Sequence, residues 1–353
     1  MANEIPKLPS IPIKRRALFG FAVAASAGGL VACSGRTTHD GTAAASAPTG
    51  SPSAVPAAPQ GDHVRVLGVN GGPILSTAHS QPALALLVGT RVYLIDCGGN
   101  TAQRLVDAGI GFAGLGNVFT THHHADHVAG LTDVALLGWT YTPSPVGDLD
   151  VWGPLKIDAV ISGMQQSLGE ATRLFSATKP PRKVTAHTIS VPATGSVEVM
   201  RDDLVKVTAT RVFHGPEVPD AYAYRFDILA SGRSVVFSGD TAGPNDNLIA
   251  LARGTDVLFH EVQMNSAVEE LLVQRAPTAN QAGLREHLFN SHTDVIAVPQ
   301  VAQKAGARHL VLCHYVPADL PIAQFHSAVQ DAAHRAGFNG RLTAPSELDV
   351  IPV

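Results

Sequence analysis

Four side chains with metal-binding chemistry lie within six residues of one another in the first half of the chain. The stretch from Thr120 to His127 is Thr-Thr-His-His-His-Ala-Asp-His, which reads with gaps as His-x-His-x-Asp-His. Its potential ligands are His122, His124, Asp126 and His127. Imidazole and carboxylate groups are ligands that suit zinc. Apolar residues flank the stretch, so the pattern predicts a strand, a loop and the first turn of a helix.

This arrangement suits two metal ions better than one. Side chains two residues apart at the end of a strand face the same side, so His122 and His124 can share an ion. Asp126 and His127 lie in the first helical turn and can face a second ion. An accidental surface cluster of histidines would not need an apolar strand and helix on either side of it.

The spacing is the signature of the metallo-β-lactamase superfamily, which the chain resembles from about Val64 to its C-terminus. The resemblance implies the αββα fold, a four-layer sandwich with two sheets between layers of helices. It also implies three further ligands at strand ends, namely an isolated His, an Asp and a final His. The sequence offers His214, Asp240 and His314, each directly after a predicted strand.

The same resemblance implies two zinc ions per chain. One ion would be held by His122, His124 and His214. The other would be held by Asp126, His127 and His314, and Asp240 would bridge the two. A shared water would then act as hydroxide at neutral pH, with Asp126 orienting it. In this superfamily the Asp at position 96 supports the site from behind the ligands.

Glu261 and His292 indicate which branch of the superfamily the chain resembles. Ribonuclease Z and the related alkyl- and aryl-sulfatases carry a Glu and a His at these points, where they transfer a proton to the leaving group. A histidine beside a glutamate is expected to be cationic or ready to donate. The structural alternative is that Glu261 is a capping carboxylate and that His292 is the N-cap of a helix. Six other histidines have no assigned role: His123, His187, His260, His287, His309 and His326.

Residues 1–33 are predicted to be an export signal. Lys14-Arg15-Arg16 precede an apolar run from Ala17 to Ala32 that is too short to span a membrane comfortably. The arginine pair resembles a twin-arginine signal, and Leu30-Val31-Ala32-Cys33 resembles a lipobox with a lipidated Cys33. The alternative is a plain signal peptide with a chance cysteine. We expect an exported protein, anchored by lipid in the periplasm or on the cell surface.

Residues 34–60 are predicted to be a disordered linker and residues 61–353 the catalytic domain. The linker consists almost entirely of Ala, Ser, Thr, Pro and Gly, which cannot bury enough apolar surface to fold. In the domain we expect alternating strands and helices without repeats. A single helix is expected over 126–137, a helix over 294–305 that is kinked or delayed by Pro299, and pocket loops at 138–150 and 262–290.

Charge argues against a nucleic-acid surface. The whole chain has a net charge of −4. Without the leader, Lys plus Arg falls from 25 to 21 and Asp plus Glu from 29 to 28, which gives −7. Nucleic-acid binding usually needs a basic face. We therefore expect a small-molecule ester as substrate and no nucleic-acid partner, and transfer-RNA processing is disfavoured for an exported protein.

The leading hypothesis is an exported two-zinc hydrolase that cleaves a phosphate or sulfate ester through a metal-bound hydroxide. A lactone or β-lactam hydrolase is the first alternative, although those branches do not usually carry the Glu261 and His292 pair. A non-catalytic metal-binding lipoprotein is the second, and the complete ligand set argues against it. The substrate, a homodimeric state, and whether Cys97 and Cys313 are free stay open.

The export signal makes a testable prediction. Replacing Arg15 and Arg16 by lysine is expected to leave precursor in the cytoplasm. Cys33→Ser is expected to release the protein from membranes, because the lipid is the anchor. Cell fractionation with antibody detection measures both effects, and Ser34→Ala is the matched control that stays in the membrane fraction. Wild-type protein found free in the extracellular fraction would contradict the lipoprotein prediction.

Overall fold

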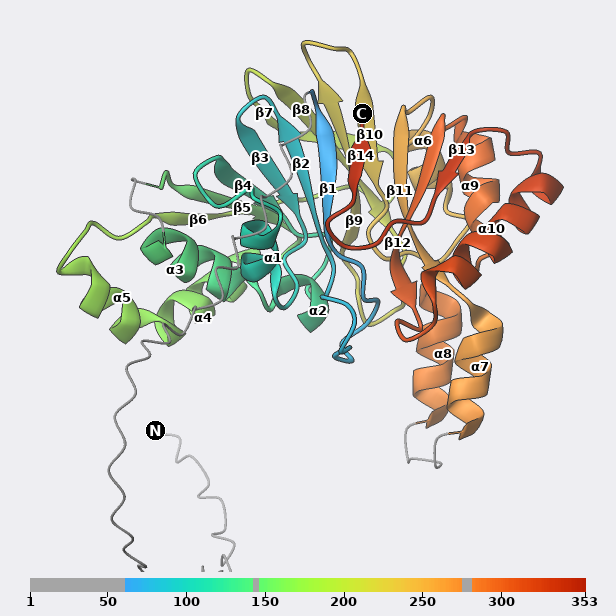
Figure 1. Ribbon diagram of the computed structural model, residues 1–353, viewed down its shortest axis with the longest axis horizontal. Coiled ribbons are helices and arrows are strands. Elements are labelled where there is room, and N and C mark those ends of the chain that lie inside the picture. Colours follow the sequence, from blue (N-terminus) through green and yellow to red (C-terminus); the bar gives the residue numbers. More distant parts are fainter. Residues whose placement is uncertain (1–60, 142–145, 275–280) are drawn as a thin grey trace, which may run out of the picture. The chain divides into compact units, whose positions relative to one another are not determined.

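The computed structural model describes residues 61–141, 146–274 and 281–353 (Figure 1). The predicted signal peptide and linker lie outside these residues, so export and the lipid anchor stay predictions. Within the described ranges, no helix is both long enough and apolar enough to cross a membrane.

The first sheet has seven strands in the order β14-β1-β2-β3-β4-β5-β6. Its strands are β1 (His63–Gly68), β2 (Ala83–Val88), β3 (Arg91–Ile95), β4 (Leu115–Phe119), β5 (Leu149–Gly153), β6 (Val184–Thr188) and β14 (Val350–Pro352). Neighbours from β14 to β3 pair antiparallel, and those from β3 to β6 pair parallel. The parallel strands therefore end at one edge of the sheet, where β4 leads into the histidine-rich stretch.

The second sheet also has seven strands, in the order β13-β12-β11-β10-β9-β8-β7. They are β7 (Ser196–Arg201), β8 (Val205–Val212), β9 (Ala221–Ile228), β10 (Ser234–Phe237), β11 (Val257–Gln263), β12 (His309–Val316) and β13 (Arg341–Thr343). Pairing is antiparallel from β7 to β10 and parallel from β10 to β13. Each sheet thus joins an antiparallel half to a parallel half.

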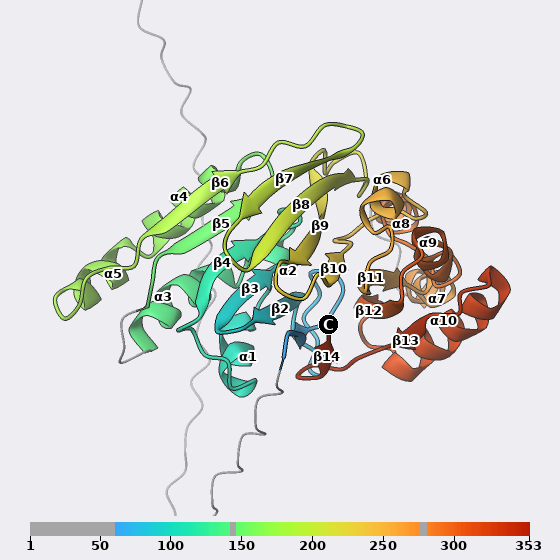
Figure 2. The same ribbon diagram turned by 90° about the horizontal axis from the view of Figure 1, so that it is seen from above.

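Helices cover the outer faces of both sheets (Figures 1 and 2). Beside the first sheet lie α1 (Thr101–Asp107), α2 (Ala125–Val128), α3 (Leu131–Tyr141), α4 (Ile157–Ser167) and α5 (Gly169–Ser176). Beside the second lie α6 (Asp246–Leu251), α9 (Val298–Ala305) and α10 (Ile322–Ala336). The paired helices α7 (Asn265–Gln274) and α8 (Gln281–Ser291) project from the second half. The predicted αββα sandwich is confirmed.

Aromatic side chains fill the space between the two sheets next to the histidine-rich stretch. Phe119, the last residue of β4, is fully buried. Its ring centroid lies 5.1 Å from that of Phe226 and 5.6 Å from that of Tyr224, both on β9 of the opposite sheet. Because interiors are close-packed, this contact fixes the end of β4 and hence the start of the loop that follows.

The helix expected over 126–137 is in fact two helices, α2 and α3, with Gly130 between them. A Cβ atom added to Gly130 would lie 2.1 Å from the Gly98 carbonyl oxygen, so only glycine allows this approach. The Gly130 amide donates to the Cys97 carbonyl at 2.8 Å, and the Cys97 amide donates to the His127 carbonyl at 2.8 Å. These two hydrogen bonds hold α2 against the turn that follows β3.

The two predicted pocket loops are partly helical. The expected loop at 262–290 contains α7 and α8, and α3 runs to Tyr141 inside the loop expected at 138–150. Val268 and Leu272, four residues apart on α7, are its buried residues, a stripe too short to recognise in the sequence. Helix α9 begins at Val298, later than 294, with Pro299 in its first turn, where proline is tolerated.

Candidate metal centre

Asp96 fixes the histidine-rich stretch from behind. It follows β3 with a left-handed φ of 57°. Its Oδ1 accepts the Thr121 amide at 2.7 Å, and its Oδ2 accepts the Thr121 hydroxyl at 3.0 Å. The same Oδ2 lies 2.9 Å from Nδ1 of His127. Because a carboxylate only accepts, Nδ1 of His127 carries the hydrogen and Nε2 is left for a ligand role.

The first predicted group of three ligands comes together as buried or half-buried imidazoles. Nδ1 of His124 lies 2.9 Å from Nε2 of His122 and 3.2 Å from Nε2 of His214. His214 donates from Nδ1 to the Ser291 carbonyl at 2.9 Å. Burial lowers the pKa of His122 well below its usual value and that of His214 to about 3. Both rings are therefore neutral at pH 7, as metal ligands must be.

The second predicted group also comes together, with His314 in an unexpected backbone setting. Oδ2 of Asp126 lies 3.4 Å from Nε2 of His127 and 3.5 Å from Nε2 of His314. His314 does not close its strand, because β12 continues to Val316. The pairing with β11 skips His314, which has a φ of 48°. This bulge turns the side chain out of the alternating pattern of the strand and towards the centre.

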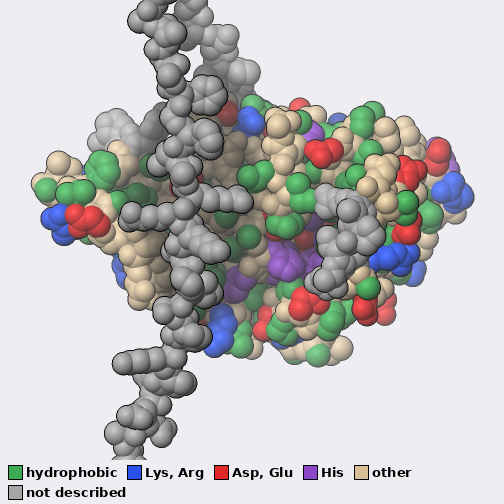
Figure 3. Space-filling view, turned by 90° about the horizontal axis from the view of Figure 1, so that it is seen from below, with side chains coloured by type: hydrophobic (Ala, Val, Ile, Leu, Met, Phe, Trp, Pro, Cys, Tyr) green, Lys and Arg blue, Asp and Glu red, His purple; other side chains and the backbone are tan. Residues whose placement is uncertain are grey.

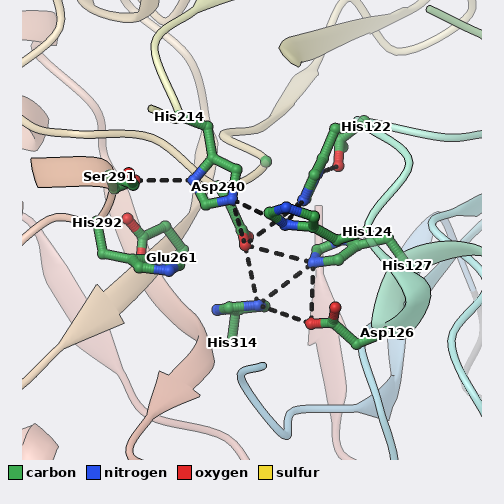
Figure 4. Close-up of polar contacts among 12 residues, drawn as sticks. His122, His124, Asp126, His127, His214, Asp240, Glu261, Ser291, His292 and His314 are labelled. Atoms are coloured by element: carbon green, nitrogen blue, oxygen red, sulfur yellow. Dashed lines mark hydrogen bonds and ion pairs between the residues drawn. The ribbon is translucent and has the colours of Figure 1, made fainter. Parts of the chain in front are cut away.

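Asp240 lies at the middle of both groups (Figure 4). Its Oδ2 is 3.1 Å from Nε2 of His314 and 3.4 Å from Nε2 of His127. The same oxygen is 3.7 Å from Nε2 of His214 and 3.9 Å from Nε2 of His122. The structure thus gathers all seven predicted ligands, with Asp240 between the two groups.

The donor set fits a metal ion. Oδ1 of Asp240 is buried and has no hydrogen-bond partner among the described residues. Burial favours neutral His314, yet Asp240 and Asp126 outweigh it and raise the pKa of His314 to about 10. The carboxylates therefore draw a positive charge into the cluster, and a bound cation would supply that charge in place of the proton.

Glu261 and His292 form a buried pair beside this cluster. Oε2 of Glu261 lies 3.3 Å from Nδ1 of His292, and Oε1 accepts the Thr293 amide at 2.7 Å. Glu261 thus also accepts a backbone amide as a capping carboxylate would, whereas His292 is not a helix N-cap, because it directly follows α8. The ring of His292 stacks on that of His314 with centroids 5.6 Å apart. The pair is therefore next to the site where a substrate would react.

Burial shifts the pKa of both members of this pair towards the uncharged form. Burial, reinforced by Asp240, raises the pKa of Glu261 to about 8, and burial lowers the pKa of His292 to about 4. Of the two states expected for His292, burial disfavours the cationic one and leaves a histidine that is ready to donate. At pH 7 the pair shares one proton and can still deliver it through the imidazole.

Two residues of the site were not singled out in the sequence. Glu217 lies three residues after His214, and its Oε1 pairs with Nδ1 of His287 on α8. His287 lies four residues before Ser291, whose carbonyl holds His214. Recognising α8 as a helix would have placed His287 and Ser291 on one face. Cys97 and Cys313, next to site residues, are both free thiols within the described part of the chain.

The comparisons agree with this geometry. Residues 91–315 match the family described as "Beta-lactamase superfamily domain", so the chain belongs to that superfamily. The ribonuclease Z of Mycobacterium bovis is 30% identical over 297 residues, which cover 82% of this chain and 98% of that protein. The protein is therefore a metal-dependent hydrolase that acts on ester bonds, of the ribonuclease Z-like kind.

Solved structures show the same fold at lower identity. Human tRNase Z, short form, is 19% identical with a TM-score of 0.59, and the match covers 82% of this chain and 100% of that one. Zinc-bound PqqB from Methylobacterium extorquens is 15% identical with a TM-score of 0.55, and the match covers 82% and 100%.

The exclusion of nucleic acid in favour of a small-molecule ester is wrong. The relatives that match over nearly their whole length are named ribonuclease Z. The argument failed because net charge sums over the whole surface. Recognition of a phosphodiester at a metal centre depends on the charge at that centre, which bound cations and histidines supply locally.

Asp96 allows a direct test of the support behind the ligands. Asp96→Asn keeps the size and the left-handed tendency of the residue but removes the charge facing His127. Zinc affinity is expected to fall about 10- to 100-fold, the usual effect of losing such a partner. Competition with a chromophoric chelator measures the affinity, and Asp107→Asn on α1 is the surface control. Equal affinities in the two variants would contradict this role.

Proposed function

We propose that the protein is a two-zinc phosphodiesterase that cleaves RNA. The observation that carries the proposal is the arrangement of two groups of three ligands around the single carboxylate of Asp240. One group is His122, His124 and His214, and the other is Asp126, His127 and His314. Such paired groups suit a two-metal site for displacement at phosphorus. Zinc, when bound, supplies a Lewis acid and lowers the pKa of a coordinated water.

The residues of the chain then have distinct tasks. Asp126 orients the attacking water, since its carboxylate reaches into the cluster between His127 and His314. The attacking water gives up one proton to the solvent, and its oxygen forms a bond to phosphorus as the bond from phosphorus to the leaving oxygen breaks. The leaving oxygen takes up the proton shared by Glu261 and His292. The buried setting of that pair keeps the proton available at neutral pH.

RNA is the substrate class that the relatives favour, because they are named ribonuclease Z. The proton-donating pair fits this class, since a ribose oxygen is a poor leaving group that needs a proton. Lactone or β-lactam opening and sulfate-ester cleavage are outcomes of the test described next. In that test, zinc-loaded protein is given an RNA oligonucleotide, a nitrophenyl phosphodiester, an aryl sulfate and a lactone. Cleavage of the sulfate or the lactone alone would overturn the proposal.

The two-ion claim is tested by counting zinc. Wild-type protein is expected to bind about two ions per chain, as a binuclear site requires. Asp240→Ala is expected to lose at least one ion and most of the activity, because the bridging carboxylate is gone. Elemental analysis gives the count, and circular dichroism checks that the fold is kept. Asp203→Ala, an exposed carboxylate outside the centre, is the matched control. One ion or none in wild type would contradict the claim.

The proton donor is tested by changing the leaving group. His292→Ala is expected to slow substrates with a ribose leaving group by roughly 10²–10⁴-fold, the usual contribution of general acid catalysis. A nitrophenyl phosphodiester should lose much less, because nitrophenolate leaves without a proton. Single-turnover rates measure both, with His326→Ala on α10 as control. Equal slowing of the two substrates, or loss of zinc, would show that His292 has another role.

A further inference from the structure

His287 is a histidine at the rim of the metal centre that the ligand set does not use. Its ring centroid lies 5.4 Å from that of His214, 5.7 Å from that of His124 and 6.1 Å from that of His292. The His287 side chain is 25% exposed, whereas that of His214 is fully buried. Figure 3 shows histidine side chains gathered in a hollow on one face of the molecule. His287 is therefore placed to touch a substrate at this site.

The His287 ring is held in one orientation by residues of two separate segments. Nδ1 pairs with Oε1 of Glu217 and lies 3.3 Å from the Ser291 hydroxyl. Gly215, with a φ of 87°, makes room for this pairing. A Cβ atom there would lie 2.7 Å from the Ser291 hydroxyl and 2.8 Å from Oε2 of Glu217. The loop after His214 thus brings a carboxylate back against α8.

This pairing determines what the ring can offer a ligand. Because a carboxylate only accepts, Nδ1 of His287 carries the hydrogen that faces Glu217, and Nε2 is the ring nitrogen left for another partner. No hydrogen bond of Nε2 is found among the residues that the structure describes. His287 therefore presents a ring nitrogen in a fixed position, which suits a hydroxyl group on the substrate because a hydroxyl can both donate and accept.

We propose that His287, oriented by Glu217, forms a hydrogen bond through Nε2 with the ribose 2′-hydroxyl and so selects RNA over DNA. The inference rests on the proposed phosphodiesterase function. When the bond from phosphorus to the 3′ oxygen breaks, His292 serves that oxygen, and the 2′-hydroxyl lies on the adjacent carbon. The His287 ring, which lies beside that of His292, is therefore where this hydroxyl would be recognised. The 2′-hydroxyl is the group by which proteins distinguish RNA from DNA.

The test compares two oligonucleotides that differ by one hydroxyl. Both are DNA, and one carries a single ribonucleotide on the 5′ side of the cleaved bond. For zinc-loaded wild type, kcat/KM is expected to be roughly tenfold higher for the ribo substrate. This factor is the usual net contribution of one hydrogen bond. In His287→Ala this ratio should fall to about one, through loss on the ribo substrate. A nitrophenyl phosphodiester, which has no such hydroxyl, should slow by a smaller factor.

Three companion variants separate recognition from support of the fold. His287→Gln keeps a side-chain amide that can hydrogen-bond to a hydroxyl and should retain part of the preference. Glu217→Gln loses the carboxylate that orients the ring and should lose most of it. These two variants measure the same ratio should His287→Ala fail to fold. His334→Ala on α10, an exposed histidine outside the site, should keep the wild-type ratio.

Each outcome bears on one claim. An unchanged ratio in His287→Ala, equal slowing of all three substrates, or loss of zinc would overturn the role of His287 while leaving the phosphodiesterase in place. Wild type that cleaves both oligonucleotides equally well would do the same. Wild type that holds zinc but cleaves no phosphodiester would overturn the proposed function, and this inference with it.

Discussion

The gathering of five imidazoles and two carboxylates in one place, all but His124 buried, is the constraint on which the rest of the structure depends. Buried polar groups are unfavourable unless each has a partner. Asp96 and the Ser291 carbonyl fix the outer nitrogens of His127 and His214. Their other ring nitrogens lie around Asp240. The negative charge of this buried carboxylate must be balanced by a proton on the histidines or by a metal ion. The glycine contacts, the bulge in β12 and the packing of Phe119 all maintain this meeting point.

The parts of the site that the sequence predicted are those set by local geometry. The stretch from His122 to His127 is recognisable because a strand, a loop and a helical turn impose fixed directions on neighbouring side chains. His214 and Asp240 follow strands whose apolar patterns are clear. The αββα fold was predictable for the same reason, since periodicity identifies strands and helices one at a time and the resemblance gives their arrangement.

The parts that the sequence did not predict depend on contacts between distant segments. The bulge at His314 arises from pairing with β11, and the break at Gly130 arises from contact with Gly98. The raised pKa of Glu261 reflects its burial and the nearby Asp240, and no local sequence pattern reveals either of them. Glu217 and His287 meet only because α8 packs beside the loop after His214. The argument from net charge failed for a related reason. The summed charge of the chain does not show how charge is distributed around the metal centre.

The ligands come from both sheets, and this affects the stability of the folded protein. The segment after β4 supplies four ligands, while β8, β10 and β12 of the other sheet position three. An ion can therefore bind fully only when the two halves are docked. By linkage, zinc a hundredfold above its dissociation constant would stabilise the folded state by about 2.7 kcal/mol per site. Zinc supply would thus govern how long the folded protein survives proteolysis, apart from any effect on turnover.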